Sequence, residues 1–303
     1  MKFPAALALC LSLAAPALAD DAWPEECRLS EVASFPMTLR EDGHVVIPVA
    51  VEGREKTFVV DTGGYASSLS PRAADDLGLK RRPLTARKVR DLGGATATEY
   101  VRAGSFALGS MVARDFDLMV LDGLNNADGL IAPDLLLQFD VEFDFAARRV
   151  NLFKPHPCSG KAVYWKGPYV QVPFDTTEDG HVRVGVTLDG RDTMAMLDTG
   201  SPVTLITLRD AARYFDIDPN STSLTPVAAL HGGQGGTAAT YAYPFKSLTM
   251  GGVNVNNPRV LLTDSEGLNR HEHTPMLIGM NVMRHLHLYF AYHEHELYIS
   301  PGG

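Results

Sequence analysis

Two copies of an Asp-Thr-Gly tripeptide are the residues in this sequence with the clearest potential for chemistry. They occupy residues 61–63, in "VVDTGG", and residues 198–200, in "MLDTGS". In each copy the acid follows an apolar run, and glycine lets the chain turn sharply directly after it. A single tripeptide of this kind would predict only an ordinary Asx turn at the end of a strand. Its recurrence in the same apolar context predicts a role that needs both copies.

The tripeptides belong to a longer internal duplication. "EDGHVVIPVAVEGREKTFVVDTGG", which begins at Glu41, aligns without a gap with "EDGHVRVGVTLDGRDTMAMLDTGS", which begins at Glu178. The same offset of 137 residues relates Ser70 to Thr207, each of which precedes a short helical pattern and is a good N-cap residue. Later segments align at offsets of 142 and 147 residues, so we expect longer surface loops in the second copy. The chain therefore predicts two copies of one domain in tandem.

Alternating apolar residues predict the elements that position the tripeptides. Segments such as "HVVIPVAVEG" and "HVRVGVTLDG" alternate as half-buried strands do, and long helical periodicity is scarce. We therefore predict an all-β fold of two pseudo-symmetric lobes with short helices. The expected divisions are an N-terminal segment at 20–34, a first lobe at 35–155, a linker at 156–168 and a second lobe at 169–303.

The duplication predicts that the two acids meet. Tandem copies tend to pack about a twofold axis, so Asp61 would face Asp198. Two carboxylates in contact cannot both ionise easily, and they would share one proton. The ionised acid could then accept a proton from a water held between them, while the protonated acid polarises the carbonyl group that this water attacks. Thr62 and Thr199 would hydrogen-bond to the backbone of the opposite copy, although a satisfied hydroxyl at a strand end is the alternative.

These motifs resemble those of the aspartic peptidases of the pepsin and retropepsin type. Each tripeptide is followed downstream by an apolar-apolar-small element, "GLIAPD" in the first copy and "MLIGMN" in the second. The resemblance extends from about Phe35 to Ile299 and is to exported bacterial members with two retropepsin-like lobes in one polypeptide. It implies two acid-protease barrels with a cleft between them, in which a peptide or protein substrate binds in an extended conformation.

The resemblance also implies roles for individual residues. The catalytic pair would be Asp61 and Asp198, which act as an aspartic endopeptidase on peptide bonds. The supporting residues would be Thr62, Gly63, Thr199, Gly200 and Ser201, and the substrate-binding flaps would contain Gly93, Gly94, Gly235 and Gly236.

The residue after each tripeptide differs between the copies. Gly64 stands where the family usually has Ser, Thr or Ala, whereas Ser201 fits the family pattern. A hydroxyl at this position can donate to the neighbouring carboxylate and favour its ionised form. We therefore expect Asp198 to carry more of the negative charge and Asp61 more of the shared proton.

A second departure leaves another function open. Ala132 replaces the small glycine that the second copy keeps as Gly279. Alanine would be strained there if the position needs a positive φ or close backbone contact. The alternative to a working peptidase is therefore a catalytically weak or inactive peptide-binding or regulatory protein on the same fold.

The N-terminus predicts export. Residues 1–19 combine Lys2, a short apolar stretch and an Ala-x-Ala cleavage site, as a secretory signal does, so the mature protein is expected to be periplasmic or secreted. No later run reaches the roughly 18 apolar residues of a membrane helix, which argues against membrane insertion. The formal net charge is −9, and loss of Lys2 makes it more negative, so we expect no nucleic-acid partner.

Two cysteines remain after the signal is removed, Cys27 and Cys158. In an oxidising compartment an even pair is expected to form a disulfide, although two unrelated buried thiols are the alternative. The chain carries both halves of the expected site, so we also expect a monomer.

The histidines near the C-terminus form three His-x-His pairs. On a strand such a pair places both rings on one face, which can suit zinc, but no cysteine or His-Glu-x-x-His helix supports a metal. The first-lobe counterparts of His285 and His287 are Gln138 and Asp140, which we expect on a solvent-exposed face. We therefore predict a pH-sensitive surface, with no metal and no cofactor. The six histidines are His271, His273, His285, His287, His293 and His295.

Overall fold

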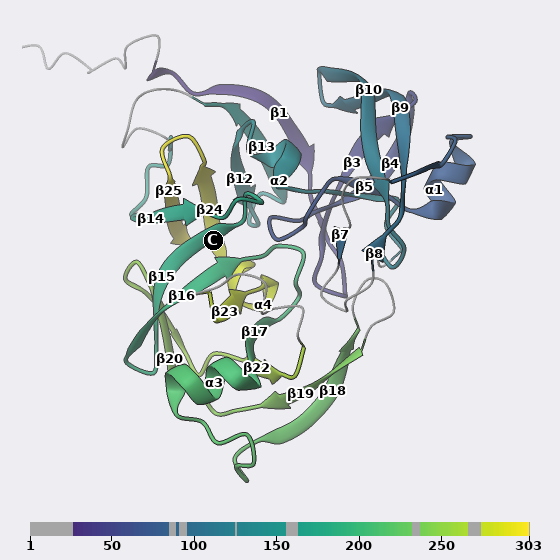
Figure 1. Cartoon of the computed structure of the whole chain (residues 1–303). Coiled ribbons are helices and arrows are strands. Elements are labelled where there is room, and N and C mark those ends of the chain that lie inside the picture. Colours follow the sequence, from purple (N-terminus) through teal and green to yellow (C-terminus); the bar gives the residue numbers. More distant parts are fainter. Residues whose placement is uncertain are drawn as a thin grey trace, which may run out of the picture.

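The computed structural model of the chain describes residues 27–84, 89–90, 96–124, 126–155, 163–231, 237–265 and 274–302. Within these ranges strands dominate and the helices are short. Figure 1 shows two lobes, one built from the purple and blue strands and one from the green and yellow strands. The predicted all-β class with two lobes and short helices is confirmed.

The first lobe is a sheet that closes on itself. Its strands follow the order β2-β3-β4-β11-β5-β10-β9-β6, and β3 also pairs with β9. The strands are β2 (Thr38–Leu39), β3 (Val45–Val51), β4 (Arg54–Val60), β5 (Ser68–Leu69), β6 (Arg82–Pro83), β9 (Glu99–Leu108), β10 (Met111–Val120) and β11 (Gly129–Ile131). The helices are α1 (Pro71–Asp76) and α2 (Pro133–Leu136), and β7 (Val89–Arg90) pairs with β8 (Thr96–Ala97) as a separate hairpin.

The second lobe repeats this plan. Its strands are β15 (Val182–Leu188), β16 (Arg191–Leu197), β17 (Thr204–Thr207), β18 (Thr225–His231), β19 (Thr237–Ala242), β20 (Ser247–Met250), β21 (Val253–Asn256), β22 (Val260–Thr263) and β23 (Met276–Ile278), with helices α3 (Leu208–Phe215) and α4 (Met280–Met283). In both lobes the strand that leads to an Asp-Thr-Gly tripeptide pairs in parallel with a short downstream strand, β4 with β11 and β16 with β23. The two tripeptides therefore have equivalent surroundings.

A sheet built from both lobes joins them. Its strands are β1 (Ser30–Pro36), β12 (Asp140–Asp144), β13 (Arg149–Lys154), β14 (Val170–Thr176), β24 (Leu286–Ala291) and β25 (Glu296–Pro301). They lie side by side in the order β1-β13-β12-β24-β25-β14, and antiparallel pairing of β12 with β24 links the lobes (Figure 1). Strand β1 of this sheet begins at Ser30, within the expected N-terminal segment 20–34. The expected lobe and linker boundaries at residues 35, 156 and 169 stay predictions.

The helices begin where the sequence predicts. The Ser70 side chain accepts a hydrogen bond of 3.1 Å from the backbone N of Ala73, and the Thr207 side chain accepts one of 3.0 Å from Asp210 N. Both residues are therefore N-caps, as predicted. No helix among the described residues is long and apolar enough to cross a membrane.

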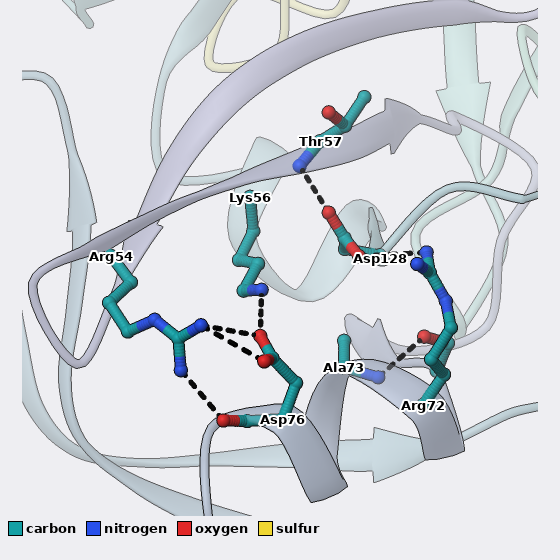
Figure 2. A network of polar contacts seen from close by, with 8 residues as sticks. Arg54, Lys56, Thr57, Arg72, Ala73, Asp76 and Asp128 are labelled. Carbon is teal, nitrogen blue, oxygen red and sulfur yellow. Dashed lines mark hydrogen bonds and ion pairs between the residues drawn. The ribbon is translucent and has the colours of Figure 1, made fainter.

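Surface ion pairs fasten α1 to the strand that precedes the first tripeptide. Figure 2 shows Arg54 and Lys56, on β4, bound to the carboxylate of Asp76 at the end of α1. Asp128 accepts from the backbone N of Thr57 at 3.0 Å and also pairs with Arg72. These contacts lie at the surface of the first lobe, so they position its helix rather than the acids.

Candidate active site

The two acids stand at the ends of buried strands. The last three residues of β4 and of β16 are buried, and Asp61 and Asp198 follow directly. The backbone N of Asp61 donates to Ile131 O at 2.9 Å, and that of Asp198 donates to Ile278 O at 3.0 Å. Each acid is thus held by the parallel strand beside it, and its side chain points to the lobe interface.

The glycines of the two tripeptides fit closely against the opposite acid. Gly63 N donates to Asp61 Oδ1 at 2.9 Å, and Gly200 N donates to Asp198 Oδ1 at 2.8 Å. A Cβ on Gly63 would lie 2.3 Å from Asp198 Cγ, and one on Gly200 would lie 2.2 Å from Asp61 Cγ. Neither glycine has a positive φ, so close approach to a carboxyl group is the reason for glycine here.

The threonines form reciprocal hydrogen bonds across the interface. Thr62 Oγ1 donates to Leu197 O at 2.8 Å and accepts from Thr199 N at 3.0 Å. Thr199 Oγ1 donates to Val60 O at 2.7 Å and accepts from Thr62 N at 3.0 Å. Both threonines are fully buried, so these bonds replace water and fix the distance between the strand ends. This is the cross-lobe contact expected from the sequence.

The carboxyl groups of Asp61 and Asp198 approach each other across the interface, because each lies against the tripeptide glycine of the opposite lobe, and each shifts the pKa of the other. Asp198 is 5% exposed, and Asp61 is partly exposed. Burial raises the pKa of Asp61, although the hydrogen bonds from Asp198 and Gly63 lower it in part. Burial also raises the pKa of Asp198, well above its ordinary value, and the charge of Asp61 raises it further. A buried pair of this kind holds one proton and one negative charge.

The expected role of the Ser201 hydroxyl is wrong. Its Oγ donates to Val203 O at 2.8 Å, and only the backbone N–H of Ser201 supports the Asp198 carboxyl group. Burial raises the pKa of both acids, so the expected division of charge, with more of the negative charge on Asp198 and more of the shared proton on Asp61, stays a prediction. The serine side chain instead closes the loop that follows the tripeptide.

Alanine at position 132 is not strained. Ala132 has an extended backbone, with φ −115° and ψ 178°, and so has Gly279, with φ −102° and ψ −173°. Crowding distinguishes the two positions. A Cβ on Gly279 would lie 2.3 Å from Val203 O and 2.6 Å from Ser201 O, whereas the first lobe leaves room for a buried methyl group.

Two histidines that the sequence analysis did not single out touch the site. His44 Nε2 lies 3.0 Å from Gly200 O, and His181 Nε2 lies 3.0 Å from Gly64 O. Each histidine reaches the loop of the opposite lobe. The signal was present in the sequence, because both histidines end the repeated "EDGH" that opens the duplication.

A late histidine belongs to a buried cluster rather than to an exposed face. His287 Nε2 lies 2.9 Å from Glu142 Oε1, and the same carboxylate accepts from Trp165 Nε1 at 2.7 Å. Burial raises the pKa of Glu142, but hydrogen bonds from His287 and other donors outweigh it, so the pKa lies below its usual range. Asp140, the counterpart of His287, is 1% exposed, so its expected place on a solvent-exposed face is wrong.

Several predicted residues lie outside the described ranges. These are the flap glycines Gly93, Gly94, Gly235 and Gly236, the histidines His271 and His273, and Cys158. The hairpins on either side of the flap positions are described, as β7 with β8 and β18 with β19. Cys27 is 5% exposed, and its disulfide with Cys158 stays a prediction. Among the residues that the structure describes, no group of three or more His, Cys, Asp or Glu side chains could hold a metal ion.

Comparison with known proteins decides the family. A family model described as aspartyl protease matches residues 47–135 and 184–282, which include both tripeptides. The chain belongs to the aspartyl protease family. The fold agrees: the chain is similar to an aspartic proteinase from Irpex lacteus, with 14% identity and a TM-score of 0.52 over 89% of this chain and 97% of that one. No curated protein matches the chain. At such low identity the likeness to this aspartic proteinase shows the fold alone.

Proposed function

We propose that this protein is an aspartic endopeptidase that hydrolyses peptide bonds with a water activated between Asp61 and Asp198. The observation that carries the proposal is that the two acids converge at the lobe interface, where the tripeptide glycine beside each acid lies against the carboxyl group of the other. Membership of the aspartyl protease family supports it.

The proposal gives the two acids of the pair complementary roles. The ionised acid of the pair accepts a proton from the water as the water oxygen attacks the peptide carbonyl carbon. The protonated acid donates a hydrogen bond to the carbonyl oxygen and stabilises the charge that develops there. The C–N bond then breaks, and the leaving amine takes up a proton from the pair. No covalent intermediate with the protein forms, and the shared proton is restored at the end of the cycle.

An extended peptide is the proposed substrate. The hairpin of β7 and β8 and that of β18 and β19 occur at equivalent places in the two lobes, and strand edges can pair with an extended main chain. The proposal includes Gly93, Gly94, Gly235 and Gly236 as the flap residues at the ends of these hairpins. It also includes export to the periplasm or medium, removal of residues 1–19, and action as a monomer, since one chain supplies both acids.

Cleavage of a quenched peptide library across pH tests the proposal. The wild-type protein is expected to cleave, and Asp61→Asn and Asp198→Asn are each expected to lower kcat/KM by at least about 10³-fold, because each removes one partner of the proton pair. Asp216→Asn is the matched control, since its side chain is 74% exposed on the second lobe. Peptide binding without cleavage, or full activity in either active-site variant, would overturn the proposal.

A further inference from the structure

Two equivalent turns bring a histidine from each lobe to the other. His44 lies between β2 and β3, and His181 between β14 and β15, and they are 7% and 2% exposed. The glycine before each has a positive φ, +91° at Gly43 and +84° at Gly180. A Cβ on Gly43 would lie 3.0 Å from Pro202 Cβ, so this turn packs directly against the loop of the opposite lobe. The repeated "DGH" is therefore an element of the lobe interface.

The hydrogen bonds of these histidines end beside the acids. A carbonyl oxygen only accepts, so the Nε2 atom of each histidine carries a hydrogen and donates it at 3.0 Å. The acceptor of His44 is Gly200 O, and the backbone N of the same Gly200 donates to Asp198 Oδ1. The acceptor of His181 is Gly64 O, directly after the glycine that donates to Asp61. Each histidine thus holds the loop that orients the acid of the other lobe.

The two acceptors differ by one position for a physical reason. In the second lobe Ser201 O already accepts a hydrogen bond of 2.8 Å from the backbone N of Met280, which is the first residue of α4. The first-lobe counterpart of Met280 is Pro133, which has no N–H to donate. Gly64 O, the counterpart of Ser201 O, is therefore open to His181, whereas His44 bonds one residue earlier. Both lobes keep a histidine contact despite different loops, which argues that the contact itself matters.

An ion pair lies beside the His44 ring. His44 Nδ1 lies 3.0 Å from Asp42 Oδ1, and Arg40 pairs with the other oxygen of Asp42. His181 follows Asp179, the counterpart of Asp42, and its ring lies edge-on to Tyr65. Both histidines face the charge of Asp61, and they lower its pKa against the larger effect of burial.

We propose that His44 and His181 are reciprocal positioning residues, each of which holds, through its Nε2–H, the backbone carbonyl beside the acid of the opposite lobe. This inference rests on the proposed function. Neither histidine is assigned a proton transfer. In its protonated form each histidine would also make ionisation of Asp61 easier, because the two histidines lower the pKa of this acid.

Paired substitutions separate the hydrogen bond from the charge. Glutamine at either position keeps an N–H close to the place of Nε2 but has no charge, whereas leucine keeps volume and loses the donor. His44→Leu and His181→Leu are each expected to lower kcat about 10- to 100-fold with little change in KM, because small displacements of reacting groups cost rate rather than binding. The glutamine variants are expected to recover most of kcat, with the acidic limb of the kcat/KM profile moved to higher pH. His285→Gln, at an exposed position, is the matched control.

A readout without cleavage keeps this inference separate from the proposed function. In ¹H–¹⁵N spectra of the wild-type protein and of Asp198→Asn, the Nε2–H signals of two histidines are expected to exchange slowly with water and to vanish one by one in the glutamine variants. If no peptide is cleaved, the proposed function fails while these signals still test the contacts. Rapid exchange of both protons overturns the inference. Wild-type kcat in the leucine variants would also overturn the inference. So would glutamine variants whose kcat is as low as that of the leucine variants and whose kcat/KM profile keeps the wild-type acidic limb.

Discussion

The two lobes are nearly identical at the Asp-Thr-Gly tripeptides, where they touch, and they differ from the next residue onward, Gly64 in one lobe and Ser201 in the other. At the interface the paired threonine hydrogen bonds of the two lobes agree within 0.1 Å, with N···O distances of 3.0 Å in both and O···O distances of 2.8 and 2.7 Å. Each of these contacts uses one residue from each copy, so a change in one lobe disturbs both. Mutual contacts therefore keep the duplicated residues alike.

The loops behind the tripeptides show the opposite behaviour. In the first lobe the carboxylate of Asp134, at the start of α2, accepts from Ser67 N at 3.0 Å and from Ser67 Oγ at 2.7 Å. In the second lobe the equivalent positions are Asn281 and Thr204, whose side chains bond at 2.7 Å, and backbone N–H groups of α4 hold the loop. These contacts lie within one lobe. Each lobe can therefore satisfy its buried polar groups in its own way.

Alanine at the tripeptide glycines should break the symmetric part of the site most severely. In Gly63→Ala and Gly200→Ala the new Cβ would lie 2.3 and 2.2 Å from the Cγ of the opposite acid, so that carboxyl group must move. A displacement of about 1 Å at a reacting group costs about 10²-fold in rate, and both variants are expected to lose at least that much kcat/KM.

The control for these variants is Gly185→Ala, because a Cβ on Gly185 meets nothing within 4 Å and its φ is not positive. Its kcat/KM should equal that of the wild-type protein. Equal losses in Gly63→Ala and Gly200→Ala support a mutual site. Full activity in one of them would show that only one lobe constrains the acids.

The positions before α2 and α4 test the part in which the lobes differ. In Gly279→Ala the methyl group would lie 2.3 Å from Val203 O, and overpacking against backbone is expected to cost about 3 kcal/mol of unfolding free energy. Ala132→Gly only removes a buried methyl group and adds backbone freedom, which should cost about 1 kcal/mol. Urea unfolding of both variants measures the difference. Equal costs would contradict the crowding assigned to the second lobe.

Features that depend on repeated local patterns could be predicted from the sequence. The duplicated strands and turns predict two lobes, and the capping residues Ser70 and Thr207 predict the starts of two helices. The meeting of Asp61 with Asp198 follows from the duplication, because equivalent residues near an axis come together. None of these inferences needs the path of a particular loop.

Features that depend on the partner of a side chain could not be predicted in this way. The acceptors of His44 and His181 are backbone carbonyls, which every residue has, so no sequence pattern marks them. The Ser201 hydroxyl was expected to donate to a carboxylate but donates to Val203 O, because the path of the loop decides its acceptor. Asp140 is buried because the joining sheet combines strands of both lobes, which a reading of one lobe at a time misses.

The joining sheet offers a test of another difference between the copies. Where the second lobe has His287, the first has Asp140, and burial followed by the charge of Glu294 raises the Asp140 pKa to about 7. From about pH 4, where this carboxyl titrates in the unfolded chain, to about pH 7, the folded protein keeps a proton that the unfolded chain has lost. Stability therefore falls as pH rises through this window.

Asp140→Asn removes this titration. Relative to the variant, the wild-type free energy of unfolding is expected to fall by about 3 kcal/mol between pH 4 and pH 7, as measured by urea unfolding at several pH values. Glu142→Gln is the counterpart with the opposite sign, because hydrogen bonds lower the Glu142 pKa and its contribution is present above the unfolded value. Parallel stability curves for Asp140→Asn and the wild-type protein would contradict the burial argument.

The smallest expected difference between the lobes lies at the surface. Arg54 and Arg191 are equivalent residues that each reach the end of their own lobe's helix and pair with an acid there. Their side chains are 53% and 49% exposed. The carbonyl acceptors are Asp76 O at 2.7 Å and Tyr214 O at 3.0 Å, and the paired acids are Asp76 and Asp216.

Arg54→Ala and Arg191→Ala should each cost less than about 1 kcal/mol, because exposed ion pairs are well screened by water. In the first lobe Lys56 also binds Asp76 (Figure 2), so this carboxylate keeps a partner when Arg54 is removed. Arg191→Ala is therefore expected to be the more costly change, by a few tenths of a kcal/mol, in thermal unfolding at low salt. The difference should vanish at about 1 M salt, where charges are screened within about 3 Å. If the difference between the two variants persists at this salt concentration, its cause would instead be the hydrogen bonds from the arginines to the helix-end carbonyl groups.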